Sequence, residues 1–198
     1  MLQTANKTPE NTYFETEPHI WNDGTINGHD YVDLGLSVKW ATCNVGVKSP
    51  SDYGNYYAWE ETEIKSSYDE DNCATWEKQI GGIAGTSRDM ARVKWGGSWR
   101  MPTLDEFEEL LDKCTWTWTA LNGVNGYKVT GPNGNSIFLP AAGYRYGTSL
   151  GLAGELGGYW SSTPFFTQSA YYLRFYGGYR SPGWHDRNCG LTVRPVTE

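Results

Sequence analysis

Histidines, cysteines and closely spaced carboxylates are the residues of this sequence that could do chemistry at neutral pH. The three histidines, His19, His29 and His185, lie far apart, and none belongs to an HExxH metal-binding motif. The sequence also contains no GxGxxG dinucleotide-binding loop and no phosphate-binding loop with its lysine. The adjacent carboxylates Glu60 and Glu61 could act as a general acid and base, but we favour solvent-exposed charge for this pair. We therefore expect no catalytic residues and no cofactor.

The four cysteines, Cys43, Cys73, Cys114 and Cys189, contain no CxxC pair and no zinc-ribbon spacing. Two disulfides are arithmetically possible, with three connectivities, but we favour mostly free thiols. The tripeptide at residues 21–23, Trp-Asn-Asp, is similar to a calcium-site motif of sugar-binding lectins. It lacks the further carboxylates that a hard cation needs, so we expect no metal site.

Length and charge narrow the classes of partner. The 198 residues favour one principal domain, and the net charge of −7 disfavours a nucleic-acid partner. No apolar run approaches the roughly 20 residues that cross a bilayer, so we expect no membrane insertion. The many aromatic residues and 24 glycines favour short strands and long loops over an aromatic core.

Several segments have recognisable periodicity. Residues 1–27 are polar and aperiodic, which indicates an arm or linker. Alternation of Leu36, Val38 and Trp40 predicts a strand, and residues 56–59, 170–176 and 191–196 are further strand candidates. The segment YKVTGPNGNSIFLP predicts a hairpin around its Pro-Asn-Gly turn.

Two helices are predicted between these strands. Thr103 with Glu106 three residues later forms a capping-box pattern before an amphipathic run that includes Phe107. Thr86 with Asp89 suggests a second box, opening a short helix that ends before the glycines at 96 and 97. The combination of helices and strands predicts an α+β class.

The last third of the chain differs in composition from the rest. Residues 144–198 hold 12 aromatic residues, five arginines and no lysine, a bias typical of protein interfaces. We assign four of its apolar residues to the core: Tyr159, Trp160, Leu173 and Phe175. Six others fall in predicted loops or on the opposite strand face, and we interpret them as binding residues: Phe165, Phe166, Tyr172, Tyr176, Tyr179 and Trp184.

Six ordered motifs resemble a known family. They are HDYVDLGLSVKWATCNVG, SDYGNYYAWEET, WGGSWRMPTLDEFEELL, LPAAGYR, GYWSST and GLTVRPV. Together, over residues 28–198, they resemble the Bacteroides-type major paralogous domain proteins of the C-type lectin fold, related to formylglycine-generating-enzyme-like domains. Within that family, residues 144–191 are similar to the variable region of a diversity-generating retroelement protein. In such proteins, adenine-directed mutagenesis changes scattered codons, and the short scaffold segments between them stay constant.

The resemblance implies a C-type lectin fold and a non-enzymatic, ligand-binding function of receptor-binding or adhesin type. Its location would be extracellular, on a cell surface or phage virion, and its ligand a protein or glycan on a target surface. The implied scaffold residues are Trp95, Trp99, Arg100, Trp160 and Arg194. The implied binding residues are Tyr146, Leu152, Leu156, Phe165, Phe166, Tyr172, Arg174, Tyr176, Tyr179, Ser181, Trp184, His185 and Asp186.

Two alternatives stay open. A structural module of a surface fibre or pilus tip would bury the same aromatic residues against a partner subunit. A formylglycine-generating-type oxidase would require Cys114 and Cys189 side by side, because Cys189 is the single cysteine of the last 84 residues.

Overall fold

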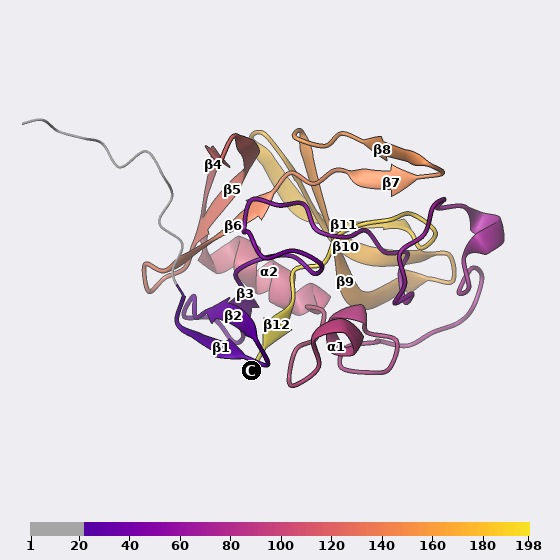
Figure 1. The fold of residues 1–198 in the computed structure, drawn as a ribbon, viewed down its shortest axis with the longest axis horizontal. Coiled ribbons are helices and arrows are strands. Elements are labelled where there is room, and N and C mark those ends of the chain that lie inside the picture. The colour runs from indigo at the N-terminus through magenta and orange to yellow at the C-terminus, as the bar shows by residue number, and fades with distance from the viewer. Residues whose placement is uncertain (1–21) are drawn as a thin grey trace, which may run out of the picture.

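The computed structural model describes residues 22–198, and most of its regular structure is strand. The strands pair in four small antiparallel sheets, which are joined by long loops (Figure 1). Residues 1–21 of the expected arm lie outside the described residues. The first strand, β1, begins at Gly24.

This content corrects the expected α+β class with the C-type lectin fold. Strand accounts for 41% of the structure and helix for 11%, so the protein is mostly β. Both predicted helical segments are present, but they cover only six and ten residues. Two of the longest strands, β9 (Leu156–Phe166) and β11 (Tyr179–Asp186), contain many of the residues that we assigned to loops.

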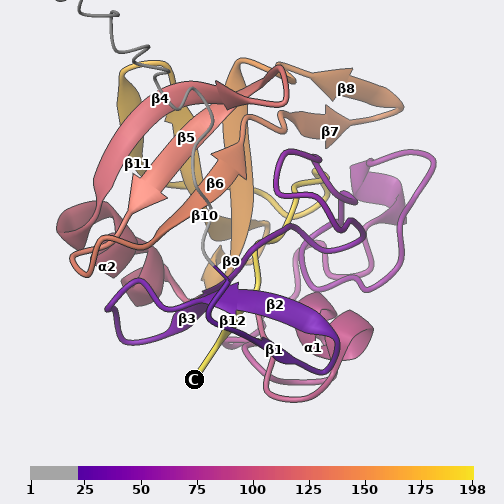
Figure 2. The same cartoon turned by 60° about the vertical axis from the view of Figure 1, so that its left-hand side comes forward.

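One sheet joins the two ends of the described chain. Its strand order is β1-β2-β3-β12, and Val196 of β12 pairs with Trp40 of β3. The carboxyl terminus therefore lies beside the first strands (Figure 2). The strands are β1 (Gly24–Ile26), β2 (His29–Val32), β3 (Lys39–Ala41) and β12 (Val196–Thr197).

A second sheet follows helix α2 (Leu104–Lys113) as a meander, with the order β4-β5-β6. Asn122 and Gly123 join the first two strands with φ angles of 52° and 78°, the left-handed values of a type I′ hairpin turn. The predicted hairpin around residues 131–135 is confirmed as the turn between the second and third strands. The strands are β4 (Thr115–Leu121), β5 (Val124–Thr130) and β6 (Ser136–Pro140).

The last third of the chain forms two further sheets. A short hairpin projects from one end of the molecule, and the three-stranded sheet β11-β10-β9 follows it (Figure 1). In this sheet β10 is central and β11 is an edge strand. The strands not yet given are β7 (Tyr144–Tyr146), β8 (Ser149–Gly151) and β10 (Ser169–Tyr176).

Residues 42–89 cross the molecule with little regular structure, apart from one turn of 3-10 helix, η1 (Glu70–Asn72). The expected strand at residues 56–59 is reduced to a bridge between Tyr57 and Leu191. The expected strand at residues 191–196 is likewise broken, because Leu191 and Thr192 pair with different segments. Thr192 pairs with Tyr159 of β9, so this part of the chain lies between the 42–89 segment and the β11-β10-β9 sheet.

Both predicted helices are present. Helix α1 (Met90–Trp95) is capped by the Asp89 carboxylate, which accepts from the Arg92 amide, whereas the expected cap Thr86 bonds to the Ile83 carbonyl. Helix α2 (Leu104–Lys113) has the predicted capping box. The Thr103 hydroxyl accepts from the Glu106 amide at 3.3 Å, and the Glu106 carboxylate accepts from the Thr103 amide at 2.8 Å.

Replacing Thr103 with Ala should lower the free energy of unfolding by about 1 kcal/mol, because it removes the acceptor for a helix-terminal amide. Urea denaturation followed by circular dichroism measures this loss. Glu108→Ala, at an exposed position of the same helix, should cost less than about 0.5 kcal/mol. Equal losses for the two variants would show that the hydroxyl does not act as a cap.

The core has two large clusters, which cover opposite faces of the β11-β10-β9 sheet, and a small third cluster of Tyr56, Ala58 and Tyr68. Leu173 and Phe175 join helix α2 and the β4–β6 sheet in the first cluster. Trp160 and Tyr172 join α1 and the 42–89 segment in the second. The predicted core residues Tyr159, Trp160, Leu173 and Phe175 are all fully buried, which confirms their assignment.

The scaffold residues also lie where they were expected. Trp95 and Trp99 are buried and pack edge to face at 5.1 Å, and Arg100 forms an ion pair with Glu106. Arg194 is fully buried. Within residues 22–198, no helix is long and apolar enough to cross a membrane.

Candidate functional site

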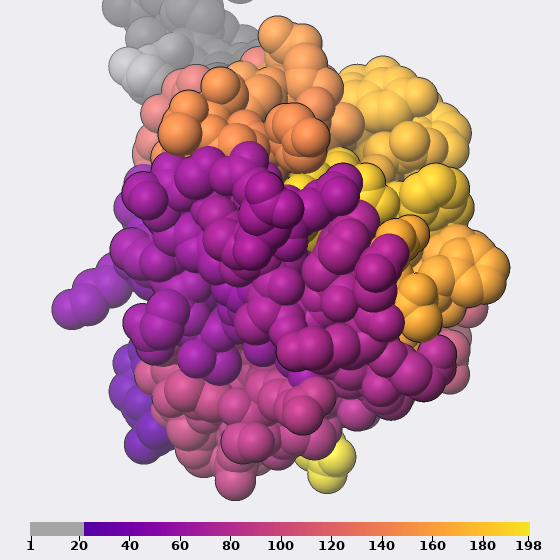
Figure 3. Space-filling view, turned by 90° about the vertical axis from the view of Figure 1, so that its right-hand side faces the viewer, coloured from indigo at the N-terminus to yellow at the C-terminus, as the bar shows by residue number. Residues whose placement is uncertain are grey.

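Large apolar side chains that reach solvent concentrate in the last third of the chain. Among the described residues nine are exposed, and seven of them lie between residues 146 and 184. Figure 3 shows this region on one face of the molecule: the orange β7–β8 hairpin at the top and the orange-to-yellow β9–β11 residues along the right-hand side. The seven are Tyr146, Leu150, Leu152, Phe166, Tyr176, Tyr179 and Trp184.

Aromatic side chains gather at one end of the β11-β10-β9 sheet, and we call this group the aromatic tip cluster. It consists of Phe165, Phe166, Tyr171 and Trp184. Phe165 stacks on Trp184 with ring centroids 5.8 Å apart and packs edge to face on Tyr171 at 5.0 Å. Phe166 lies 4.2 Å from Phe165 and is 67% exposed. The cluster joins the ends of three strands into one continuous aromatic surface.

A second group, the tyrosine–arginine cluster, lies at the other end of the same sheet. It consists of Arg174, Tyr176, Tyr179 and Ser181. Tyr176 and Tyr179 stack at 4.8 Å, and the Tyr179 hydroxyl is 2.8 Å from the Ser181 hydroxyl. Tyr171 and Arg174 are three residues apart on β10, so about 10 Å of strand separates the nearest members of the two clusters. The expected single patch is therefore divided in two.

The β7–β8 hairpin contributes a third set of exposed residues. Tyr146 is 59% exposed and Leu152 is 46% exposed, whereas Leu156 at the start of β9 is half-buried. Leu152 adopts a φ of 54°, which is unusual for a leucine and places it in the turn after β8. Leu150, 41% exposed, was missed by the sequence reading, although its position two residues before Leu152 in TSLGL offered the signal.

Tyr172 requires a correction. We expected it on an outward strand face with Arg174 and Tyr176, but it is 5% exposed. Its ring packs edge to face on Trp160 at 6.3 Å, inside the second core cluster. Alternation along β10 does not separate core from surface, because core clusters cover both faces of the sheet. Tyr172 therefore belongs to the scaffold.

His185 and Asp186 are half-buried at the end of β11. The His185 imidazole lies 5.5 Å from both the Tyr144 and Tyr172 rings, and burial lowers its pKa. Its Nδ1 atom accepts from the Asp186 amide at 2.9 Å. His185 is therefore neutral at pH 7. Its side chain packs against core and hairpin tyrosines and reaches solvent only in part.

The thiols lie apart from this surface. All four cysteines are free and buried. Cys114 belongs to the first core cluster and Cys189 to the second, so the pair required by an oxidase is not assembled. Burial raises the pKa of Cys114 to about 11 and that of Cys189 to about 12, which leaves both as unreactive thiols at neutral pH.

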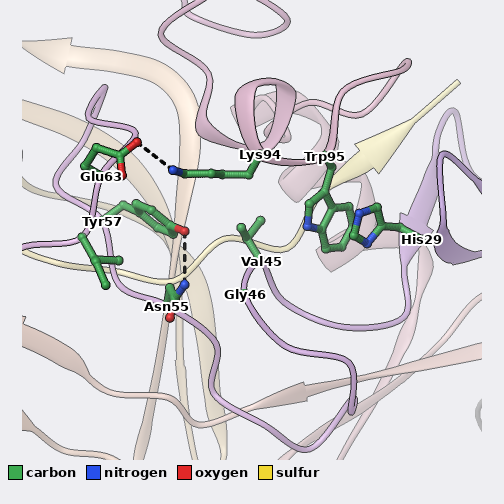
Figure 4. Close-up of a pocket in the computed structure, with 9 residues that line it drawn as sticks. His29, Val45, Gly46, Asn55, Tyr57, Glu63, Lys94 and Trp95 are labelled. Carbon is green, nitrogen blue, oxygen red and sulfur yellow. Dashed lines mark hydrogen bonds and ion pairs between the residues drawn. The ribbon is translucent and has the colours of Figure 1, made fainter.

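A separate open pocket of about 350 Å³ lies between α1 and the 42–89 segment (Figure 4). Several of its polar side chains form hydrogen bonds or ion pairs with one another. Lys94 forms an ion pair with Glu63 at 2.7 Å, and the Asn55 amide donates to the Tyr57 hydroxyl at 3.4 Å. His29 stacks flat on Trp95 at 3.8 Å and covers one face of that indole. Because its charges are internally paired, we place the candidate site on the aromatic surface instead.

The fold and the exposed side chains define a mostly β protein that carries an aromatic surface at its C-terminal strands. Residues 118–196 match a family described as a domain of unknown function (DUF8237). This range begins in β4 and contains all of the sequence-predicted binding residues. Neither the curated proteins nor the solved structures gave a match to this chain.

Proposed function

We propose that the protein is a non-enzymatic, ligand-binding protein of receptor-binding or adhesin type, and that residues 144–191 supply its binding surface. The observation that carries this proposal is the concentration of exposed apolar side chains there, seven of the nine among the described residues. Isolated exposed apolar residues are common on proteins, but contiguous aromatic groups mark interaction sites. Each cluster also lies on paired strands, which hold its rings in place before a ligand arrives.

Diversification of this surface by a retroelement is the second part of the proposal, and an extracellular location on a cell surface or phage virion is the third. Exposed and buried side chains interleave along the same strands: Tyr176 is 43% exposed, whereas neighbouring Phe175 is fully buried. Scattered codons could therefore change at exposed positions while the core stays constant. Exposed substitutions usually change stability by less than about 0.5 kcal/mol.

Sequencing of the gene and its flanking DNA from many cells tests diversification. We expect a near-copy of the 3′ coding segment nearby, differing chiefly at adenines, together with a reverse transcriptase gene. Variable codons should fall on exposed positions such as Phe166, Tyr179 and Trp184 and spare buried positions such as Trp160 and Arg194. Identical genes in all cells, with no near-copy, would contradict diversification.

Replacing Phe166 and Trp184 together with Ala should leave the melting temperature nearly unchanged and abolish binding. Both side chains are more than half exposed, at 67% and 57%, so they contribute little to the core. Flow cytometry of a panel of intact bacterial strains, stained with fluorescent protein, measures the binding. We expect at least about a tenfold loss of labelling, since aromatic residues dominate binding energy at interfaces.

The matched control replaces Ile64 and Val93 with Ala. These two side chains are 61% and 46% exposed but lie outside the C-terminal surface. This variant should label cells as the unmodified protein does. Equal labelling by the Phe166/Trp184 variant would show that the aromatic tip cluster is not a binding site.

A further inference from the structure

The cationic side chains fall into two groups that differ in their partners. The ion pairs found among the described residues all use cations between residues 65 and 113. In the last third of the chain, three arginines that reach the surface lie against aromatic rings instead. Arg145 lies over Tyr56, Arg174 over Tyr179 and Arg180 over Trp116.

Of these three arginines, Arg174 is the one with a buried donor that lacks a partner among the described residues. Its Nη2 atom donates to the Tyr179 hydroxyl at a long 3.3 Å, and its guanidinium carbon lies 5.4 Å from the centre of that ring. Its Nε atom is buried and has no hydrogen-bond partner within residues 22–198. The hydroxyls of Tyr172 and Tyr179 are its polar neighbours, and hydrogen bonding to Tyr179 raises the pKa of Arg174. The guanidinium is therefore a permanent cation whose buried Nε–H donor has no acceptor among residues 22–198.

The two buried arginines show what a satisfied guanidinium looks like in this protein. Arg187 donates to the carbonyls of Ser169 and Lys78 at 3.2 and 2.9 Å. Arg194 makes four such hydrogen bonds. A buried donor that lacks an acceptor costs free energy, so the fold elsewhere completes these bonds. At Arg174 the partner that completes them is absent from residues 22–198.

We propose that Arg174 binds a carboxylate of the ligand, and that this ligand is a protein segment in which an acidic side chain stands next to an aromatic or apolar one. The proposal rests on the function proposed above and adds its ligand chemistry. A carboxylate matches the planar fork of the guanidinium and accepts two parallel hydrogen bonds from it. On binding, Tyr179 turns aside to admit it: this residue is 38% exposed, and its hydroxyl contacts Ser181 at 2.8 Å and Arg174 at 3.3 Å.

The surroundings of Arg174 favour a protein segment with a single acidic residue over a polyanion. The chain carries a net charge of −7, which repels a highly charged partner. Stacked Tyr176 and Tyr179 beside the guanidinium offer flat apolar area, which suits an aromatic side chain adjacent to the acid. The ligand segment would thus present one carboxylate and one adjacent aromatic ring to this cluster.

Titration of the full chain with blocked dipeptides tests this inference. Acetyl-Phe-Glu-amide and acetyl-Phe-Gln-amide differ in charge and share their shape, and sodium glucuronate supplies a sugar carboxylate. The readout is the NMR signal of each arginine Nε–H group, assigned with Arg174→Gln and Arg180→Gln. We expect the Glu dipeptide to move the Arg174 signal, with an affinity at least fivefold higher than that of the Gln dipeptide. Arg174→Gln should remove this preference, whereas Arg180→Gln, at the neighbouring exposed arginine, should keep it.

Three outcomes would overturn the inference: equal affinities for the two dipeptides, shifts that follow Arg180, or tighter binding of glucuronate than of the Glu dipeptide. The cell-labelling experiment is independent, because it depends on Phe166 and Trp184 at the far end of the sheet. If labelling requires those rings while the dipeptides show no charge preference, the binding function stands and the carboxylate contact does not.

Discussion

Replacing Arg194 with Ala should lower the free energy of unfolding by about 4 kcal/mol or more, which is enough to unfold many domains of this size. The guanidinium is fully buried and ties three distant segments together. It donates to the Asn44 side chain at 2.8 Å, to the Ala41 and Thr42 carbonyls at 3.1 and 3.0 Å, and to the Phe138 carbonyl at 2.9 Å. Removal leaves these acceptors unsatisfied beside a cavity, and each unsatisfied group costs about 1–3 kcal/mol.

Urea denaturation followed by tryptophan fluorescence measures the loss, with circular dichroism to show whether the variant folds at all. Arg180→Ala is the matched control, because Arg180 is exposed and should cost less than about 0.5 kcal/mol. Arg194→Lys keeps the charge but cannot reach all four acceptors, so it should also be strongly destabilised. A loss below about 1 kcal/mol in Arg194→Ala would show that the network does not hold these segments together.

Replacing Tyr172 with Ala should cost about 3 kcal/mol, the cost of deleting a large buried aromatic side chain. Tyr172 packs against Trp160 and His185, and its ring lies across Gly183 of β11, where a Cβ atom would stand 3.0 Å away. The ring therefore fills a space that the opposite strand leaves empty. Its loss would open a cavity in the second core cluster, between the sheet and the 42–89 segment.

Tyr176→Ala is the matched control, since the same residue type is replaced four residues further along the same strand. Tyr176 is 43% exposed and stacks on Tyr179, so its removal should cost less than about 1 kcal/mol. Urea denaturation of the two variants compares the loss of a buried tyrosine of β10 with the loss of an exposed one. Equal losses in the two variants would contradict the division of this strand into core and surface residues.

Local features of the fold were predictable from sequence. The Thr103–Glu106 box fixes the start of α2, and the turn residues at 131–135 fix a hairpin, because each depends on residues a few positions apart. Non-local pairing was not predictable. Leu191 and Thr192 looked like part of one strand, yet each bridges to a different segment. The Thr/Trp alternation of β4 (Thr115–Leu121) was a strand signal that the sequence reading overlooked.

The candidate site was predictable in outline. Composition pointed to the third of the chain that holds most of the exposed apolar side chains, and six of the expected binding residues are among the nine that the described residues contain. Period-2 alternation then misplaced Tyr172, because it assumes that one sheet face meets solvent. Tyr171, which we assigned neither to the core nor to the binding residues, joins the aromatic tip cluster at the strand end.

By itself the sequence determined the short-range features of this protein: helix caps, hairpin turns and the concentration of aromatic residues and arginines after residue 144. Tertiary structure decided which of those residues reach solvent, that Cys114 and Cys189 lie in separate core clusters, and which arginines have hydrogen-bond acceptors. The physical reason is that burial and charge pairing depend on segments distant in sequence, as at Arg194, where residues 41–44, 138 and 194 meet. Arg174 and Arg194 are the same residue type on the same C-terminal segment, and their different surroundings leave the first open to a ligand and lock the second in the core.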